Sequence, residues 1–281
     1  MSADELERTG QLHSETLAEA AALLSLDQES AWKTDGIPLL WHWFFLLENP
    51  REDELGADGH PAQGIPTPPF PGAQRLFAGG RVTRLAPLRV DAPATRRTRL
   101  ARWSEKTGKS GSFFLATVVH EITQSGKVVV HEEQELVYRA RGANRHEDAA
   151  QPLVPISPEE WSVPIDPVYL FRFSALTHNS HRIHYDGDFA RRVEGHPGLV
   201  VHGPLQALLM TEYAARLGEI PAACTLDYRL TAPLYLGEGL IVGGTRGARS
   251  TELSVRNDHG VVTARGILRD IEDGDIGSSS E

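Results

Sequence analysis

Apolar and polar residues follow two kinds of pattern along this chain, one typical of helices and one typical of strands, and both kinds occur in each half. Residues 14–26 and 205–217 carry apolar side chains at intervals of three or four, which predicts one helix in each half. Ser14 is the predicted N-cap of the first helix, and Pro204 and Gly218 suit the start and the end of the second. Segments rich in β-branched and aromatic residues follow each helix, and they predict strands over residues 81–90, 94–108, 111–126, 127–140, 223–235, 238–248, 250–257 and 260–271.

The remaining segments predict loops and two shorter elements. Residues 34–80 are rich in Pro, Gly and aromatic residues, and they predict a long loop that buries its aromatics, namely Trp41, Trp43, Phe44 and Phe45. Within it, "DGHP" at 58–61 and "AGGR" at 78–81 are interpreted as turns with a structural role. The apolar run at 167–176 predicts a further strand, and residues 186–195 predict a short helix.

The order of predicted elements is the same in both halves, one helix followed by three or four strands. This order indicates an α+β fold built from a duplicated unit, with two sheets that each wrap a helix. The polar, proline-bearing segment between the halves is interpreted as a linker. The predicted organisation is an N-terminal domain over 1–143, a linker over 144–164, a C-terminal domain over 165–272 and a disordered acidic tail over 273–281.

Charge and composition exclude several classes of protein. The net charge of −10 argues against nucleic-acid binding, because phosphates require a basic face. Basic residues gather at 96–109, which is either a solvated strand and loop or a cradle for an anionic ligand such as a nucleotide phosphate. The N-terminus lacks the pattern of a signal peptide, and the longest apolar run is too short to cross a bilayer. The single cysteine, Cys224, excludes an intramolecular disulfide and favours a cytoplasmic location.

Three histidines, His178, His181 and His184, follow the predicted strand at intervals of three. They could be metal ligands, surface residues or an acid–base site. At the end of a strand a period of three directs side chains to different faces, so this spacing does not favour a metal site. We expect His178 and His196 to be exposed in loops and His181 to line a pocket.

The residues around this run resemble a known enzyme family. The stretch from Phe171 to Leu209 is similar to the signature of MaoC-like, R-specific enoyl-CoA hydratases, and the matching residues are Thr177, His184, Asp186, Ala190, His202 and Gly203. The segments "PLLWHWFFLLENP" and "LGADGHPAQGIPTPPFPGAQRLFAGGRV" narrow this resemblance to double-hotdog hydratases that act on mesaconyl- or itaconyl-type CoA esters. Similar motifs occur in hydroxyacyl-thioester dehydratases, and the resemblance extends over residues 34–271.

The resemblance implies a fold and an activity. It implies two hotdog domains, of which the C-terminal one is catalytic and the N-terminal one shapes the acyl pocket. It also implies a lyase that adds water to the double bond of a short enoyl-CoA, or removes it. The alternatives are a dehydratase of carrier-protein or polyketide intermediates and a non-catalytic hotdog protein that binds acyl thioesters.

The resemblance and the chemistry of hydration together assign roles. His184 is the expected base, because imidazole titrates near neutrality. Gly203 opens a helix, so its amide is the expected donor to the thioester oxygen. The broader family has Asp where this chain has Asn179, which can hold a water but cannot exchange protons as a carboxyl does. His184 would then make both proton transfers, or Asp186 or His181 would assist.

The remaining candidate residues are expected to bind the substrate. A dicarboxylic acyl group needs a cation in the pocket to offset desolvation of its carboxylate. Arg172 and Arg182 are the candidates for this cation, although Arg182 could instead pair with a nearby carboxylate. His202 either contacts the substrate or packs against the helix. We expect no metal and no cofactor, because coenzyme A is part of the substrate, and we expect a monomer or a homodimer with no membrane partner.

Overall fold

The computed structural model describes residues 5–26, 36–108, 111–140, 152–218 and 220–271. The N-terminal half contains β1 (Glu5–Gln11), α1 (Ser14–Leu24), the 3-10 turns η1 (Trp41–Phe44) and η2 (Glu52–Glu54), β2 (Gln74–Arg84), β3 (Pro93–Gly108), β4 (Gly111–Gln124) and β5 (Lys127–Arg139). The C-terminal half contains β6 (Trp161–Ser162), α2 (Pro167–Leu176), η3 (Arg182–His184), α3 (Gly187–Arg192), α4 (Gly203–Arg216), β7 (Cys224–Leu230), β8 (Ile241–Arg246), β9 (Ser250–Arg256) and β10 (Val262–Asp270).

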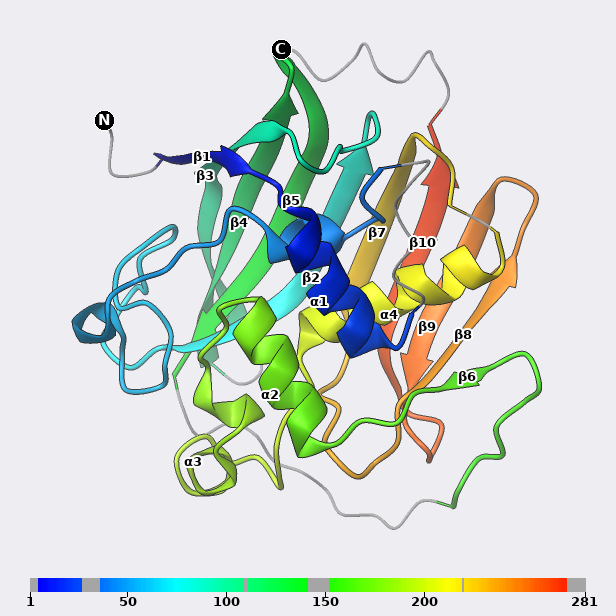
Figure 1. Ribbon diagram of the computed structural model, residues 1–281. Helices are drawn as coiled ribbons and strands as arrows, with labels where there is room; N and C mark the ends of the chain where they lie inside the picture. The colour runs from blue at the N-terminus through cyan, green and yellow to red at the C-terminus, as the bar shows by residue number, and fades with distance from the viewer. Residues whose placement is uncertain (1–4, 27–35, 109–110, 141–151, 219, 272–281) are drawn as a thin grey trace.

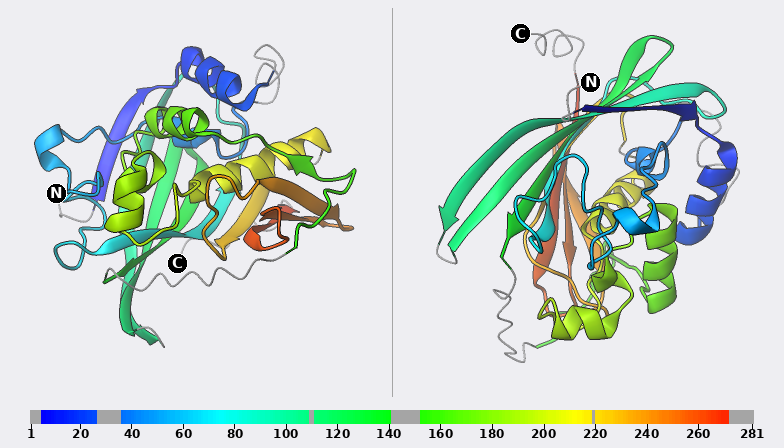
Figure 2. Two further views of the ribbon diagram at one scale, coloured as in Figure 1. Left: turned by 90° about the horizontal axis from the view of Figure 1, so that it is seen from below. Right: turned by 90° about the vertical axis from the view of Figure 1, so that its left-hand side faces the viewer.

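All of these strands belong to one antiparallel sheet. Its order is β1-β3-β4-β5-β2-β7-β10-β9-β8-β6, so the first five positions come from the N-terminal half and the last five from the C-terminal half. The two predicted sheets are therefore joined edge to edge, through the pairing of β2 with β7. The helices lie on one side of this curved sheet (Figures 1 and 2).

The junction between the halves explains the "AGGR" sequence, which is part of strand β2 and not the turn that we predicted. A Cβ at Gly79 would lie 2.3 Å from the carbonyl oxygen of Tyr228, and one at Gly80 would lie 2.3 Å from that of Glu133. Glycine is required here because β2 approaches both of its neighbours closely. The Arg81 guanidinium also pairs with the Asp227 carboxylate across the junction, at 2.6 Å.

Helix α4 lies across the sheet and packs against β2, β8, β9 and β10 (Figure 1). It is buried along almost its whole length, as the apolar pattern over 205–217 predicted. Helix α1 packs against α2 and η1, and its first residue, Ser14, follows the N-cap His13. The aromatic side chains of η1 are buried as expected, and Trp43 contacts Phe77 of β2.

Residues 167–176 form helix α2, so the strand predicted there is wrong. The aromatic and β-branched residues of this segment favoured a strand, but its start has two helix signals. The Asp166 side chain accepts a hydrogen bond from the Tyr169 amide at 2.7 Å, and Pro167 occupies the first turn. The histidine run therefore follows a helix and not a strand.

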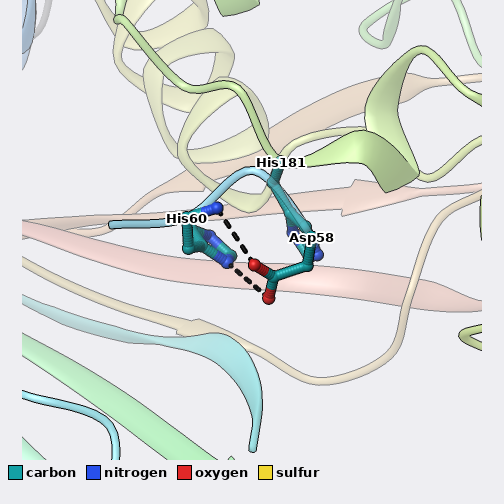
Figure 3. Close-up of side chains that lie close together, drawn as sticks. All are labelled: Asp58, His60 and His181. Carbon is teal, nitrogen blue, oxygen red and sulfur yellow. Dashed lines mark hydrogen bonds and ion pairs between the residues drawn. The ribbon is translucent and has the colours of Figure 1, made fainter. Parts of the chain in front are cut away.

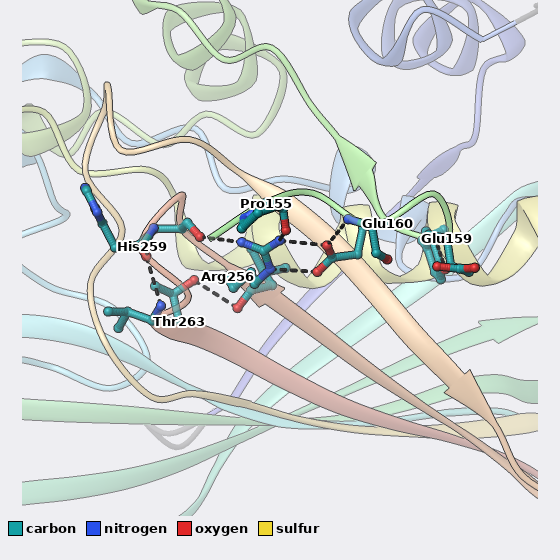
Figure 4. A network of polar contacts seen from close by, with 11 residues as sticks. Pro155, Glu159, Glu160, Arg256, His259 and Thr263 are labelled. Carbon is teal, nitrogen blue, oxygen red and sulfur yellow. Dashed lines mark hydrogen bonds and ion pairs between the residues drawn. The ribbon is translucent and has the colours of Figure 1, made fainter. Parts of the chain in front are cut away.

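The later part of the predicted linker is attached to the C-terminal half. Strand β6 pairs with β8, and the Val154 amide donates to the Asp258 carbonyl at 2.7 Å. The Arg256 guanidinium binds both carboxylate oxygens of Glu160 at 2.6 Å and donates to the Pro155 carbonyl (Figure 4). The start of the predicted linker and the predicted tail lie outside the described residues.

A buried hydrogen bond connects the N-terminal half to α4. The Trp41 Nε1–H donates to the Glu212 carboxylate at 2.6 Å. Burial raises the pKa of Glu212 to about 7, against an ordinary value of 4.5. The folded protein thus keeps a proton that the unfolded chain releases, so this carboxyl makes the fold less stable as the pH rises from 4.5 to 7.

We expect Glu212→Gln to stabilise the protein at pH 8 by about 3 kcal/mol and to have little effect at pH 5. Glutamine keeps the oxygen that accepts from Trp41 and removes the charge. Urea unfolding at both pH values measures the difference, and Glu19→Gln, at an exposed site on α1, is the control. Equal gains at both pH values would contradict the argument.

Candidate active site

A large cavity of about 1130 Å³ lies between residues of the two halves. Its lining includes the loop at 56–72 and strand β2 from the N-terminal half, and the segment at 177–184 and the start of α4 from the C-terminal half. Three of the residues predicted from the sequence, Asn179, His184 and Gly203, are brought together on its wall. Both halves are therefore needed to form this site.

The ring of His184 is oriented by a hydrogen bond from its Nδ1 to the protein backbone. It ends the 3-10 turn η3, and its Nδ1 lies 2.7 Å from the Val200 carbonyl oxygen. A carbonyl accepts only, so Nδ1 carries the proton and Nε2 is the unprotonated nitrogen. The backbone fixes this geometry, because the Val200 amide in turn donates to the Ile183 carbonyl at 3.0 Å.

The ring of His184 stacks on the ring of His202, with 3.6 Å between centroids and 19° between planes. His202 is fully buried, its Nε2 lies 2.9 Å from the Ser174 hydroxyl, and it is not part of the cavity wall. Packing and substrate contact were both left open for His202, and the structure shows it packed beneath His184. Burial lowers the pKa of His184 to about 3, so its imidazole is neutral at physiological pH.

Gly203 is the first residue of α4 and lines the cavity. Amides in the first turn of a helix have no partner within the helix, and Pro204 has no N–H to offer. A Cβ at Gly203 would lie 2.4 Å from Cδ1 of Leu230 and 3.4 Å from the ring of Phe77. Only glycine fits without a shift of Leu230, and the amide of Gly203 can face a carbonyl oxygen placed in the cavity.

Asn179 and His181 line the cavity next to this pair. The Asn179 Oδ1 accepts the His181 amide at 3.1 Å, which leaves the Asn179 amide nitrogen as the group for a water in the cavity. His181 is buried, and its Nε2 has no hydrogen-bond partner in the part of the chain that the structure describes. The rings of His181 and His184 meet edge to face, with centroids 5.5 Å apart.

Three further residues predicted for the site do not line the cavity. Asp186 caps α3 by accepting the Phe189 amide at 2.9 Å, and its carboxylate also pairs with Arg182 at 2.7 Å. This pairing was the alternative reading of Arg182, and it accounts for both side chains. Arg172 is exposed on α2 and is not part of the cavity wall. Asp186 was assigned through the family resemblance and the two arginines through their charge, and neither criterion determines where a side chain points.

Two further histidines of the cavity wall, His178 and His196, differ in their exposure. His178 is exposed, as predicted, with its Nδ1 3.3 Å from the Glu48 carbonyl oxygen. His196 was also expected to be exposed, but it is buried and lies against the Tyr235 hydroxyl at 3.3 Å. The polar run around His196 gave no sign that Tyr235 would cover it.

Two functional candidates, Asp58 and His60, lie in the turn at 58–61 for which the sequence predicted only a structural role. Their loop meets His181 inside the cavity, where the His60 and His181 ring centroids are 4.1 Å apart (Figure 3). The Asp58 carboxylate accepts from the His60 amide at 3.1 Å and lies 3.3 Å from its Nδ1. The ligand atoms of Asp58, His60 and His181 lie within 4.8 Å of one another, so among the described residues these three have a spacing that a metal ion could bridge.

Arginines on the wall of the cavity come from the N-terminal half. Arg96 lies in β3 against His120, with 3.1 Å between NH2 and Nδ1, whereas Arg97 pairs with Glu5 at 2.9 Å. The basic run therefore contains both a cavity residue and solvated ion pairs. Arg75 of β2 also lines the cavity, and within the described residues it makes no hydrogen bond or ion pair.

No helix among the described elements has the length and apolar character needed to cross a membrane.

Known proteins resemble this chain over the residues that form the cavity. A family model described as hydroxyacyl-thioester dehydratase type 2 matches residues 40–236. The chain is 42% identical over 223 residues to a mesaconyl-C(4)-CoA hydratase of Chloroflexus aurantiacus, which covers 78% of this chain and 79% of that protein. The region matched by the family model includes the cavity loop, His184 and Gly203.

Solved structures share the architecture at low sequence identity. The crystal structure of HtdX from Mycobacterium tuberculosis matches with a TM-score of 0.71 at 17% identity, covering 95% of this chain and 100% of that chain. A second Mycobacterium tuberculosis protein, described as having a double hotdog fold, matches with a TM-score of 0.51 at 14% identity over 94% of this chain and 95% of that chain. The α+β class and the double hotdog fold predicted from the sequence are confirmed.

Proposed function

Because the chain belongs to the hydroxyacyl-thioester dehydratase type 2 family and is thus a lyase, we propose that it hydrates a short enoyl-CoA with a second carboxylate, of mesaconyl-CoA or itaconyl-CoA type. The observation that carries this proposal is the shared cavity wall of His184 and Gly203. A neutral imidazole with Nε2 unprotonated and a helix-terminal amide are the two groups that addition of water to an enoyl thioester requires.

The roles follow from what each group can do. The thioester carbonyl accepts from the Gly203 amide, which stabilises negative charge on its oxygen as water adds to the β-carbon. The His184 Nε2 and the Asn179 amide hold the water, one accepting from it and the other donating to it. The hydrogen bond to the thioester oxygen polarises the conjugated carbon–carbon double bond and makes the β-carbon open to attack by water.

The acyl specificity is assigned to Arg75. A second carboxylate on the acyl group loses its hydration inside the cavity and must be paired with a cation there. Arg75 lies in the wall with no protein partner among the described residues, and its charge is close enough to lower the pKa of both His60 and His181. Arginine binds a carboxylate through two parallel N–H groups, which orients the acyl chain as well as neutralising it.

A panel of CoA esters tests the proposal. Purified protein is mixed with mesaconyl-CoA, itaconyl-CoA and crotonyl-CoA, the loss of enoyl-thioester absorbance is followed, and the products are identified by mass. We expect hydration of the dicarboxylic esters to be faster than that of crotonyl-CoA. Absence of turnover with every CoA ester, together with turnover of a carrier-protein thioester, would assign the protein to the alternative substrate class.

We expect Arg75→Gln to reduce kcat/KM for the dicarboxylic ester about 100-fold and to change that for crotonyl-CoA much less, since a charge-assisted pair is worth roughly 1.5 to 3 kcal/mol. Steady-state kinetics on both esters measure the ratio. Arg172→Gln, which removes the exposed arginine of α2, is the matched control and should leave both values unchanged. Equal losses on the two esters would remove Arg75 from carboxylate recognition.

A further inference from the structure

Several histidines line the cavity, and His60 differs from His184 in its partner. Behind His184 are the Val200 carbonyl and the ring of His202, neither of which carries a negative charge. Behind His60 is the Asp58 carboxylate, 3.3 Å from Nδ1. A carboxylate stabilises an imidazolium far more than a carbonyl or a stacked neutral ring does. His60 is therefore better able than His184 to accept a proton.

The position of this pair is set by tight contacts with the C-terminal half. Gly59, between Asp58 and His60, has a φ of +88°, and a Cβ there would lie 1.9 Å from the Ser180 carbonyl oxygen. The Ser180 hydroxyl donates to the Gly59 carbonyl at 2.6 Å, and the Arg182 amide donates to the Asp58 carbonyl at 2.9 Å. These contacts hold the loop of one domain against the histidine segment of the other.

The protonation of His60 follows from its partner. With Asp58 ionised, Nδ1 of His60 carries the proton that faces the carboxylate, so Nε2 is the free acceptor. The charged and titratable groups near His60 are Asp58 of its own loop, Arg75 of β2, His181 after α2 and His184 of η3. Burial lowers the pKa of His60, whereas Asp58 raises it, so the resting imidazole is neutral and its imidazolium is stabilised by the carboxylate.

We propose that His60, oriented by Asp58, is a catalytic residue that takes the proton from the attacking water and returns it to the substrate's α-carbon, while His184 holds the water. This inference rests on the proposed hydratase function. It accounts for a cavity in which the amide of Asn179 cannot exchange protons and His184 has no carboxylate partner.

The step balances without any further reactant. One O–H bond of the water breaks, its proton moves to Nε2 of His60, and the oxygen bonds to the β-carbon. The electron pair of the double bond moves to the thioester oxygen, which accepts from the Gly203 amide. The enolate then takes the proton from the His60 imidazolium at its α-carbon, and both imidazoles return to their starting state.

Two variants of this pair test the proposal, with the better dicarboxylic ester as substrate. We expect His60→Ala to reduce kcat about 100- to 1000-fold with a much smaller change in KM, because proton transfer and not binding is lost. We expect Asp58→Asn to reduce kcat about 10-fold and to move the acidic limb of kcat/KM to lower pH, because removal of the carboxylate lowers the pKa of His60. The controls are His131→Gln on β5 and Asp53→Asn in η2.

A third variant separates catalysis from a structural role. His60→Ala combined with Asn179→Asp places a new carboxyl on the cavity wall while keeping the oxygen that accepts from the His181 amide. We expect it to recover at least 10-fold of the kcat lost in His60→Ala, which a repaired fold alone would not explain. If His60→Ala is unfolded by thermal denaturation, His60→Gln replaces it in both comparisons.

The outcomes are distinct. Near-wild-type kcat in folded His60→Ala, with His184→Ala inactive, would leave both proton transfers to His184 and overturn this inference while the proposed function stands. Loss of wild-type activity on dialysis against a chelator, with recovery on adding Zn²⁺ alone, would make Asp58, His60 and His181 a metal site instead. A wild-type protein that turns over no ester would overturn the proposed function and this inference together.

Discussion

His184→Ala is expected to lose turnover about 10³-fold or more, the upper part of the range for removal of a group that acts on the reacting water. The physical reason is that the bond from Nδ1 to Val200 leaves Nε2 of His184 unprotonated, so this nitrogen can accept a hydrogen bond from water in the cavity that His184 and Gly203 both line. Single-turnover and steady-state kinetics on the dicarboxylic ester measure the loss.

The buried position of His184 requires a control for folding. Alanine leaves a void at this position, and the ring of His202 loses its stacking partner. Part of the loss of turnover would then reflect a less stable fold. His184→Asn keeps an amide that can donate to Val200 and fills part of the void. We expect it to have a thermal midpoint closer to that of the wild type and to be as inactive as alanine. Wild-type turnover in either folded variant would overturn the role of His184.

Gly203→Ala is the second change with a large expected effect, a loss in kcat of about 100-fold. The new Cβ would lie 2.4 Å from Cδ1 of Leu230, so either Leu230 or the start of α4 must move. A shift of the helix start displaces the amide from the thioester oxygen, and the methyl group also occupies the space by which the thioester approaches. Kinetics at saturating substrate measure the loss of kcat separately from any change in KM.

Gly198→Ala is the matched control for this substitution. A Cβ at Gly198 would meet no atom within 4 Å, and this residue is not part of the cavity wall. We expect its kcat to equal that of the wild type. If Gly203→Ala were equally active, the side chain of Leu230 would have rotated without moving the helix, and the oxygen-binding group would have to be sought elsewhere.

The predictions from local sequence were accurate where one periodicity ran over many residues. The helix at 205–217 became α4, and the strands after it became β7 to β10, because burial of one face imposes a regular apolar pattern on the chain. Residues 167–176 failed because they are short and rich in residues that favour strands, so the capping by Asp166 and Pro167 decided their structure. The "AGGR" segment failed because its glycines serve contacts with β5 and β7, which lie far away in sequence.

The candidate site divides in the same way. His184, Asn179 and Gly203 belong to one continuous motif, and the sequence alone identified them together with the enzyme family. Arg172 and Arg182 were chosen for charge and proximity in sequence, but the helix α2 and the pair with Asp186 direct them elsewhere. Asp58, His60 and Arg75 lie in a segment that contributed to the family resemblance, but nothing in that segment marked these three residues as members of the site.

The sequence by itself determined the fold class, the family and the identity of the residues at the start of α4 and in the histidine segment, because local patterns and short motifs are written along the chain. Only the tertiary structure decided which residues of the N-terminal half face them. The pairing of β2 with β7 and the contact of Gly59 with Ser180 bring Arg75, Asp58 and His60 to the cavity. Such contacts depend on packing between segments more than a hundred residues apart, and no local periodicity encodes them.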